Sequence, residues 1–299
     1  MYYIDKFIVC RIENIGNGRF GLFSYAKQCL VCFMDFYRIF LYNIAMLSLF
    51  TFIIASCALL FPTLMITITY PFSKKWALFW SNYITHRTDR LFFAILKTYC
   101  GYDFVADTKS LEGLPPKFLV VSNHQSLIDI VVYLLFFSKR YYNGREVRFV
   151  AKDALSKVPM VGKMLRTQGH CMIPRHGGAS EAMKSLEAFG TRVNASKDIV
   201  PLIFPEGTRS KDGKLGTFYS AGFRRLEETV KLPVAVCALD GGWKLSHIGM
   251  MLQNLKKGAY RVKVLKVFDV PQTKEDEKRI LAEAPALIQA QLDEWRKSE

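Results

Sequence analysis

The sequence lacks the paired cysteines of a disulfide-bonded secreted protein. Its seven cysteines are an odd number at scattered positions, so we expect free thiols and a reducing, cytosol-facing location. Cys29 and Cys32 form a lone CxxC pair in an apolar stretch, and no second pair follows. A zinc site is therefore not expected, and two buried thiols are a better interpretation of this pair than a redox site.

Other common signals are also missing. There is no Gly-x-Ser-x-Gly sequence, which makes a serine hydrolase a weak hypothesis. No cluster of metal-ligating residues is visible, and we expect neither a metal nor another cofactor. A cleavable signal peptide is not expected, because the long apolar run begins late and Asp5, Arg11 and Glu13 precede it.

Charge of one sign dominates what is present. The 41 Lys and Arg residues outnumber the 26 Asp and Glu residues, for a formal net charge of +15. This balance suggests an anionic partner, which could be a nucleic acid, a membrane surface or a phosphate-bearing substrate; the alternative is a solvated basic face. The basic residues do not accompany a recognisable nucleic-acid-binding motif, so we expect no nucleic acid partner.

One run, residues 39–72, contains no charged residue. It is longer than the roughly 20 residues that cross a bilayer, and Pro62 would kink or split a helix within it. Positive residues flank both ends, so a hairpin with both ends cytosolic and a single span stay open, as does a buried soluble helix. We expect an amphipathic, basic segment at 1–38 and a membrane-embedded helix or hairpin at 39–72.

The remainder, residues 73–299, changes character along its length. Residues 73–100 are aromatic and basic, which suits a membrane headgroup layer or ordinary helix packing. Beyond them, apolar β-rich runs alternate with helical patterns. Strands are expected at 118–121, 147–151, 170–173, 199–204, 234–239 and 261–268. Helices are expected near 126–140, 153–166, 179–194, 217–230 and 274–297, the last a surface helix interrupted at Pro285. The alternation predicts an α/β fold, a mixed or largely parallel sheet flanked by helices.

The first stretch with chemical potential runs from Ser122 to Asp129, directly after an expected strand. His124 and Asp129 would lie about 140° apart on a regular helix, but they can meet if His124 is in the loop and Asp129 in the first helical turn. Ser126 with Asp129 matches a capping box and marks such a helix start. The pair then resembles a general base with its orienting carboxylate; the alternative is a loop histidine beside a helix cap.

The second stretch runs from Ile203 to Ser210, again after an apolar strand. Gly207 would let the backbone approach a ligand, and the planar guanidinium of Arg209 suits a phosphate. Glu206 could orient Arg209 or accept a hydrogen bond from a substrate hydroxyl. The alternative is a charged turn with an internal ion pair.

Together the two stretches resemble the PlsC-like glycerolipid acyltransferase family, and within it the lysophosphatidate acyltransferases. The first motif block matches in full at Asn123, His124, Ser126 and Asp129, and the third at residues 204–210. The second block keeps Arg175 but has Pro174 where Asp is common. The fourth keeps Pro233 but has Cys237 where a second Pro often stands. The resemblance covers roughly residues 75–245.

The resemblance implies that a substrate hydroxyl attacks a thioester directly, with His124 as the base and Asp129 as its partner. It implies substrate binding by Glu206, Gly207 and Thr208, with Arg175 and Arg209 on the substrate phosphate. The implied partners are lysophosphatidate, acyl-CoA or acyl-carrier protein, and an anionic membrane surface. Residues 73–299 are then an acyltransferase catalytic domain that faces the cytoplasm from a membrane.

We therefore expect transfer of an acyl chain to the sn-2 hydroxyl of 1-acyl-glycerol-3-phosphate, giving phosphatidate in phospholipid biosynthesis. One alternative is a remodelling acyltransferase that acts on another lysophospholipid or hydroxylated lipid, since the same motifs serve that chemistry. A remote alternative is a non-catalytic lipid-binding protein on the same fold, against which the intact His124 and Asp129 argue.

Overall fold

The structure is a computed structural model that describes residues 34–35, 53, 57–58, 60–138, 145–157, 161–174, 178–245 and 258–297. The chain divides into two units, residues 1–54 and 55–299. Apart from residues 34–35, the expected segment 1–38 lies outside the described residues, as does most of the expected membrane segment 39–72.

A seven-stranded sheet forms the centre of this unit, in the order β1-β7-β6-β2-β5-β3-β4. Its strands are β1 (Asp103–Ala106), β2 (Leu119–Ser122), β3 (Glu146–Lys152), β4 (Cys171–Ile173), β5 (Ile199–Ile203), β6 (Val234–Asp240) and β7 (Ala259–Phe268). Every neighbouring pair is parallel except β6 and β7, which are antiparallel. The expected mixed, largely parallel sheet is confirmed.

Burial explains why the central strands read as continuous apolar runs. Every residue of β2 and of β6 is buried, as expected for parallel strands covered on both faces. By contrast, β7 alternates buried and half-buried residues along most of its length, the pattern of a strand with one covered face. The six strands expected from the sequence are present; β1 is an additional, half-exposed strand at the sheet edge.

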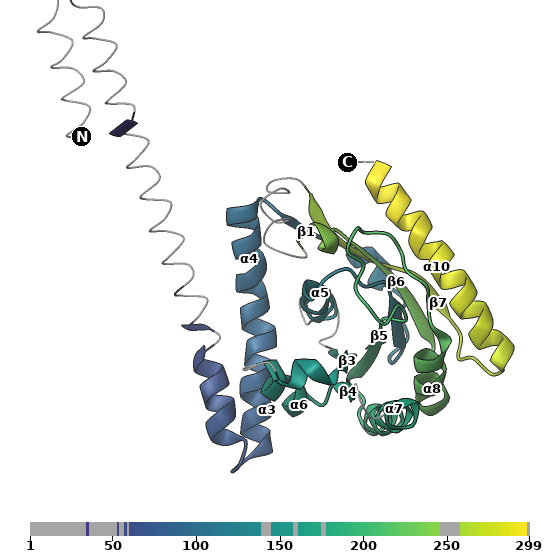
Figure 1. Cartoon of the computed structure of the whole chain (residues 1–299), viewed down its shortest axis with the longest axis horizontal. Coiled ribbons are helices and arrows are strands. Elements are labelled where there is room, and N and C mark those ends of the chain that lie inside the picture. The colour runs from purple at the N-terminus through teal and green to yellow at the C-terminus, as the bar shows by residue number, and fades with distance from the viewer. Residues whose placement is uncertain are drawn as a thin grey trace, which may run out of the picture. The chain divides into compact units, whose positions relative to one another are not determined.

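Helices cover both faces of the sheet (Figure 1). On one face lie α4 (Asp89–Cys100), α5 (Ile128–Phe136) and α6 (Val161–Gln168), which share a core with the sheet. On the other lie α7 (Gly178–Ala195), α8 (Ser220–Val230) and α10 (Lys274–Lys297). Short helical turns complete the unit at Ile84–Thr88, Thr108–Leu111, Asp153–Lys157 and Gly242–Leu245.

The C-terminal helix corrects one expectation. Instead of breaking at Pro285, α10 is continuous over 24 residues with Pro285 inside it. Ile280, Ala284, Ile288 and Leu292, one per turn, are all buried against the sheet. Burying this stripe outweighs the hydrogen bond that proline cannot donate, so α10 is an integral layer of the fold and not merely a surface helix.

Before α4, residues 60–69 are helical, and a turn connects them to α3 (Lys74–Tyr83). A small core of Ile66, Ala77 and Ile84 joins these segments. Many large apolar side chains here are exposed: Leu60, Phe61, Leu64, Ile68, Tyr70, Phe72, Trp76, Phe79 and Tyr83. In the described part of the chain, no helix has both the length and the apolar character needed to cross a membrane.

Candidate active site

The two sequence motifs meet at one edge of the sheet. Residues 123–127 follow β2 and residues 204–219 follow β5, and these strands pair in parallel. Residues 241–245 follow β6, the parallel neighbour of β2 on its other side. Because parallel strands end at the same edge, three loops distant in sequence converge there, as is usual for ligand sites of α/β proteins.

His124 and Asp129 are in direct contact, with 2.7 Å between His124 Nδ1 and Asp129 Oδ2. His124 lies in the loop after β2, and Asp129 lies in the first turn of α5, so the expected loop-and-helix geometry is confirmed. The carboxylate can only accept, so the neutral imidazole carries its proton on Nδ1. Its Nε2 then presents a lone pair, which is the arrangement of a general base.

The Asp129 carboxylate is buried but well supplied with donors. Its Oδ2 also accepts from the backbone N–H groups of Gln125, at 2.6 Å, and Ser126, at 2.9 Å. Its Oδ1 accepts from the hydroxyl of Tyr260. The expected capping box is present in modified form, because the Ser126 hydroxyl accepts from Ile128 N–H. Together these donors compensate the desolvation of a buried charge.

The loop after β5 holds the His124 loop in place. The ring of Phe204 stacks on the His124 ring, with centroids 4.1 Å apart and 12° between planes. The His124 backbone N–H donates to Glu206 Oε1 at 2.7 Å, and the Ser210 N–H donates to the His124 carbonyl at 2.8 Å. Residues 204–210, the third motif block, therefore hold the loop of the first motif block, which contains His124.

Glu206 acts as a bridge between loops. Its second carboxylate oxygen, Oε2, accepts from Gly216 N–H at 2.8 Å, so both oxygens are engaged by backbone donors and not by Arg209. Burial raises the pKa of Glu206, while the N–H groups of His124 and Gly216 act in the opposite direction. A β-carbon at Gly216 would lie 2.7 Å from Oε2, so this close approach requires glycine.

The other expected substrate-binding residues are on the exposed side of the same loop. Gly207, Thr208 and Arg209 are all exposed, next to the Ser210 that bonds to His124. Gly207 has φ +63° and open space around its missing side chain, so the left-handed turn, and not crowding, favours glycine there. Arg175, expected on the substrate phosphate, lies outside the described residues.

Asn123 and Gln125 tie the His124 loop to the end of β6. The Asn123 amide donates to the Leu239 carbonyl at 2.7 Å and accepts from the Leu239 N–H at 3.0 Å. The Gln125 amide donates to Asp240 at 3.0 Å. Asp240 also accepts twice from Arg296 of α10, at 2.8 and 2.7 Å. Although burial opposes it, these bonds lower the pKa of Asp240 and keep the carboxylate charged.

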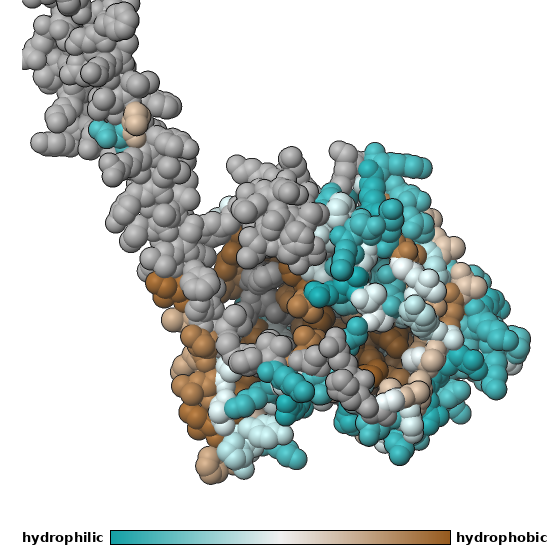
Figure 2. Space-filling model, viewed as in Figure 1, coloured by the Kyte–Doolittle hydropathy of each residue, from teal (hydrophilic) through white to brown (hydrophobic). Residues whose placement is uncertain are grey.

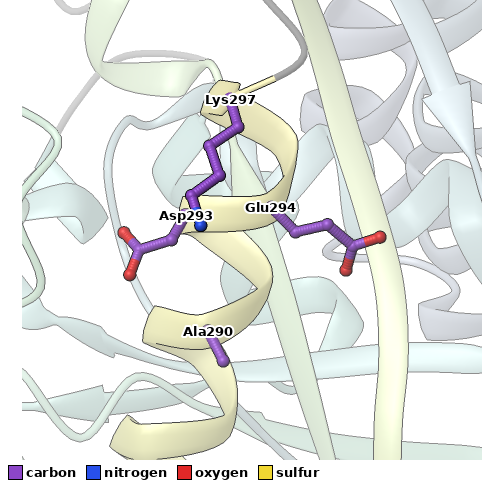
Figure 3. A pocket seen from close by; sticks show the side chains of 4 residues that line it. All are labelled: Ala290, Asp293, Glu294 and Lys297. Atoms are coloured by element: carbon purple, nitrogen blue, oxygen red, sulfur yellow. The ribbon is translucent and has the colours of Figure 1, made fainter.

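Two further features lie outside this cluster. An open hollow of 540 Å³ on α10 is lined by Ala290, Asp293, Glu294 and Lys297 (Figure 3). None of these four residues forms one of the hydrogen bonds that hold the His124 loop. Among the described residues, no group of three or more His, Cys, Asp and Glu side chains could hold a metal ion.

Comparisons with known proteins agree with the motifs. Residues 107–240 match the model of the Acyltransferase family. The chloroplastic 1-acyl-sn-glycerol-3-phosphate acyltransferase BAT2 of Brassica napus is 30% identical over 149 residues, 49% of this chain and 40% of that protein. The 1-acyl-sn-glycerol-3-phosphate acyltransferase of Helicobacter pylori is 30% identical over 127 residues, 42% of this chain and 50% of that protein. The chain thus spans half or less of these relatives.

A solved structure shares the fold. The crystal structure of PlsC from Thermotoga maritima, a 1-acyl-sn-glycerophosphate (LPA) acyltransferase, superposes with a TM-score of 0.59. The match covers 84% of this chain and 95% of that chain at 20% sequence identity. At this identity the likeness concerns the architecture, a mostly parallel sheet with helices on both faces.

Proposed function

We propose that the chain acylates the sn-2 hydroxyl of 1-acyl-glycerol-3-phosphate and so forms phosphatidate in phospholipid synthesis. The match of residues 107–240 to the model of the Acyltransferase family supports this proposal. The names of the relatives in Brassica napus and Helicobacter pylori support this substrate. The observation that carries the proposal is the 2.7 Å contact between His124 Nδ1 and Asp129 Oδ2. The loop that contains His124 is held in place by the loop after β5 and by the end of β6.

In this proposal His124 acts as the base. Its Nε2 takes the proton of the substrate hydroxyl while the oxygen attacks the thioester carbonyl carbon. Asp129 accepts from Nδ1–H and stabilises the imidazolium that forms. The C–S bond then breaks, the new ester is released, and the leaving sulfur takes the proton back from Nε2. No covalent acyl-enzyme is needed, and the donor is acyl-CoA or acyl-carrier protein.

The substrate phosphate is proposed to bind Arg209 and Arg175. Arg209 lies in the exposed part of the loop after β5, and the residue that follows it, Ser210, donates its backbone N–H to the His124 carbonyl. Arg175 follows β4 in the sequence. A guanidinium pairs with phosphate through two parallel hydrogen bonds, which would orient the lysolipid with its free hydroxyl toward His124.

We also propose that the chain works at a membrane, with residues 39–72 embedded and the catalytic domain on the cytoplasmic side. The exposed large hydrophobic and aromatic side chains between Leu60 and Tyr83 support this, and Figure 2 shows brown, hydrophobic surface over this part of the chain. The aromatic side chains of Trp76, Phe79 and Tyr83 suit the headgroup layer of a membrane. The net charge of +15 would favour an anionic leaflet.

A substrate panel tests the proposed reaction. Purified full chain in mixed micelles is supplied with a labelled acyl chain on coenzyme A or on acyl-carrier protein. The acceptors, tested separately, are lysophosphatidate, lysophosphatidylcholine, lysophosphatidylethanolamine and lysophosphatidylglycerol. We expect labelled phosphatidate from lysophosphatidate to dominate, because its phosphate is a terminal group open to two arginines. Transfer only to another lysolipid would overturn the substrate, and no transfer from either acyl-CoA or acyl-carrier protein would overturn the reaction.

A further inference from the structure

Strand β7 brings one more side chain to the proposed active site. Because β7 runs antiparallel to β6, it begins at the edge of the sheet where β2 and β6 end. Asp240, the last residue of β6, pairs with Arg261, and Tyr260 is the residue before it. Tyr260 lies beyond residues 107–240, the part of the chain that matches the Acyltransferase family.

Tyr260 is fully buried and its hydroxyl donates to Asp129 Oδ1. The other oxygen of that carboxylate, Oδ2, is the one that faces His124. Burial and the Asp129 charge raise the pKa of Tyr260 well above its ordinary value, so the phenol stays protonated and remains a donor at any physiological pH. The phenol can therefore donate to the carboxylate throughout the pH range in which the enzyme would work.

The residues around the contact between Tyr260 and Asp129 are closely packed. A β-carbon at Gly242 would lie 2.2 Å from the Tyr260 oxygen and 2.7 Å from Asp129 Oδ1, so glycine is needed there for steric reasons. The Tyr102 ring packs edge-on against Tyr260 with centroids 6.4 Å apart, and the Tyr102 hydroxyl donates to the Gly241 carbonyl at 2.7 Å. The missing side chain of Gly242 and the packing of the Tyr102 ring thus hold the Tyr260 hydroxyl against the carboxylate, whereas the Tyr102 hydroxyl bonds to the backbone and not to Asp129.

We propose that Tyr260 is a positioning residue for the His124–Asp129 pair: it fixes the plane of the carboxylate and shares its negative charge. The proposal rests on the acyl transfer proposed above. Without the phenol, Oδ1 would be buried with one donor fewer and more negative charge would remain on Oδ2. The imidazolium would then be held more tightly, and His124 would be neutral over a narrower, more alkaline range of pH.

Within the part of the chain that the structure describes, few other titratable groups face this pair. The carboxylate of Glu206 lies on the backbone side of His124, and the phenols of Tyr133 and Tyr260 are close to Asp129. Burial raises the pKa of Tyr133 well above its ordinary value, so it stays neutral throughout. Replacing Tyr260 by Phe leaves these other groups in place, and a change in pH dependence would then report on the lost hydroxyl.

The test compares Tyr260→Phe with the matched control Tyr102→Phe, which also removes one buried hydroxyl but not one on Asp129. In Tyr260→Phe we expect kcat to fall about tenfold, the order expected for one hydrogen bond to a charged group, with KM within about twofold. The acid limb of the pH profile of kcat/KM should move to higher pH. Tyr102→Phe should keep the wild-type profile even if its Tm falls.

A second readout separates this inference from the proposed reaction. Carbethoxylation of His124 by diethyl pyrocarbonate requires a neutral imidazole, so its rate against pH, followed by peptide mass spectrometry, tests the pair without any turnover. The rise in rate should occur at higher pH in Tyr260→Phe than in wild type. A wild type that transfers no acyl group would overturn the reaction, while this curve would still decide the role of Tyr260.

Wild-type kcat and unchanged pH curves in Tyr260→Phe would overturn the inference, as would equal changes in Tyr102→Phe. Should Tyr260→Phe not fold, Gly242→Ala is the second variant, because its methyl group would intrude between the phenol and the carboxylate. It should then show the same move of the carbethoxylation curve, and a wild-type curve in a folded Gly242→Ala would contradict the proposal.

Discussion

At the scale of single residues, an interaction between residues close in sequence could be predicted, and interactions between residues far apart in sequence could not. His124 and Asp129 are five residues apart, and the rule for helix starts was enough to bring them together. Glu206 was expected to orient Arg209, three residues away, or to accept from a substrate hydroxyl. In the structure its oxygens accept from the backbone N–H groups of His124 and Gly216. The bond to His124 spans 82 residues, and no local pattern encodes a partner at that distance.

Glu227 is a second residue whose environment the sequence did not reveal. It is 3% exposed on α8, and its Oε1 has no hydrogen-bond partner among the described residues. Burial, reinforced by the neighbouring carboxylate of Glu277 on α10, raises its pKa from 4.5 to about 7. The folded protein therefore binds this proton more tightly than the unfolded chain does.

This predicts a pH-dependent effect of Glu227→Gln. The stability that protonated Glu227 supplies is complete below about pH 4.5 and is lost as pH rises through about 7. A neutral amide avoids that loss, so the variant should be more stable than wild type by about 1–2 kcal/mol at pH 8 and nearly equal at pH 4.5. Denaturant unfolding at the two pH values measures this.

Glu228→Gln is the control, since that side chain on the same helix is 46% exposed and should change stability little at either pH. An equal gain for Glu227→Gln at pH 4.5 and pH 8, or no gain at pH 8, would contradict the buried-acid account.

At the scale of elements, long buried runs were predictable and short or interrupted ones were not. β2, β5 and β6 are apolar except for the final Ser122 of β2 and the final Asp240 of β6, and they are buried nearly throughout. β1 has only four residues, alternates exposed and half-buried, and begins with the charged Asp103, so no apolar run marks it. The helix α10 continues through Pro285 because its buried stripe faces the sheet, and that partner is invisible in the sequence.

The same limit applies to what β7 and α10 bring to the site. Tyr260 reaches Asp129 because β7 is antiparallel to β6 with a particular register. Arg296 reaches Asp240 because α10 packs across the sheet and ends near the end of β6. Strand order and register are tertiary facts, so composition and motif spacing could assign these residues no role.

The helical segment ending at Tyr83 supplies a test of the membrane proposal. With the full chain reconstituted in vesicles, lipids brominated on their acyl chains should quench tryptophan fluorescence, because Trp76 on α3 is 57% exposed. Much of the quenching should disappear in Trp76→Phe. It should remain in Trp295→Phe, which alters a ring on α10 that packs against the core. Equal quenching in Trp76→Phe and wild type would exclude α3 from the bilayer interface.

At the scale of the whole molecule, the sheet arrangement makes the site. Three parallel strands end at one edge, and their loops hold His124 from both sides. Two antiparallel neighbours, β6 and β7, let a later part of the chain reach the same edge. The fold class followed from alternating strands and helices, and the candidate pair followed from motif spacing. The supporting network required the three-dimensional arrangement.

The most direct test of the central claim is the initial rate of labelled phosphatidate formation from lysophosphatidate by wild type and His124→Ala. The loss of a general base predicts a fall of about 10²–10⁴-fold or more, with Tm close to wild type because His124 lies in an edge loop. His86→Ala, a change to an exposed histidine outside the site, should retain the wild-type rate. Near-normal turnover by a folded His124→Ala would contradict the account.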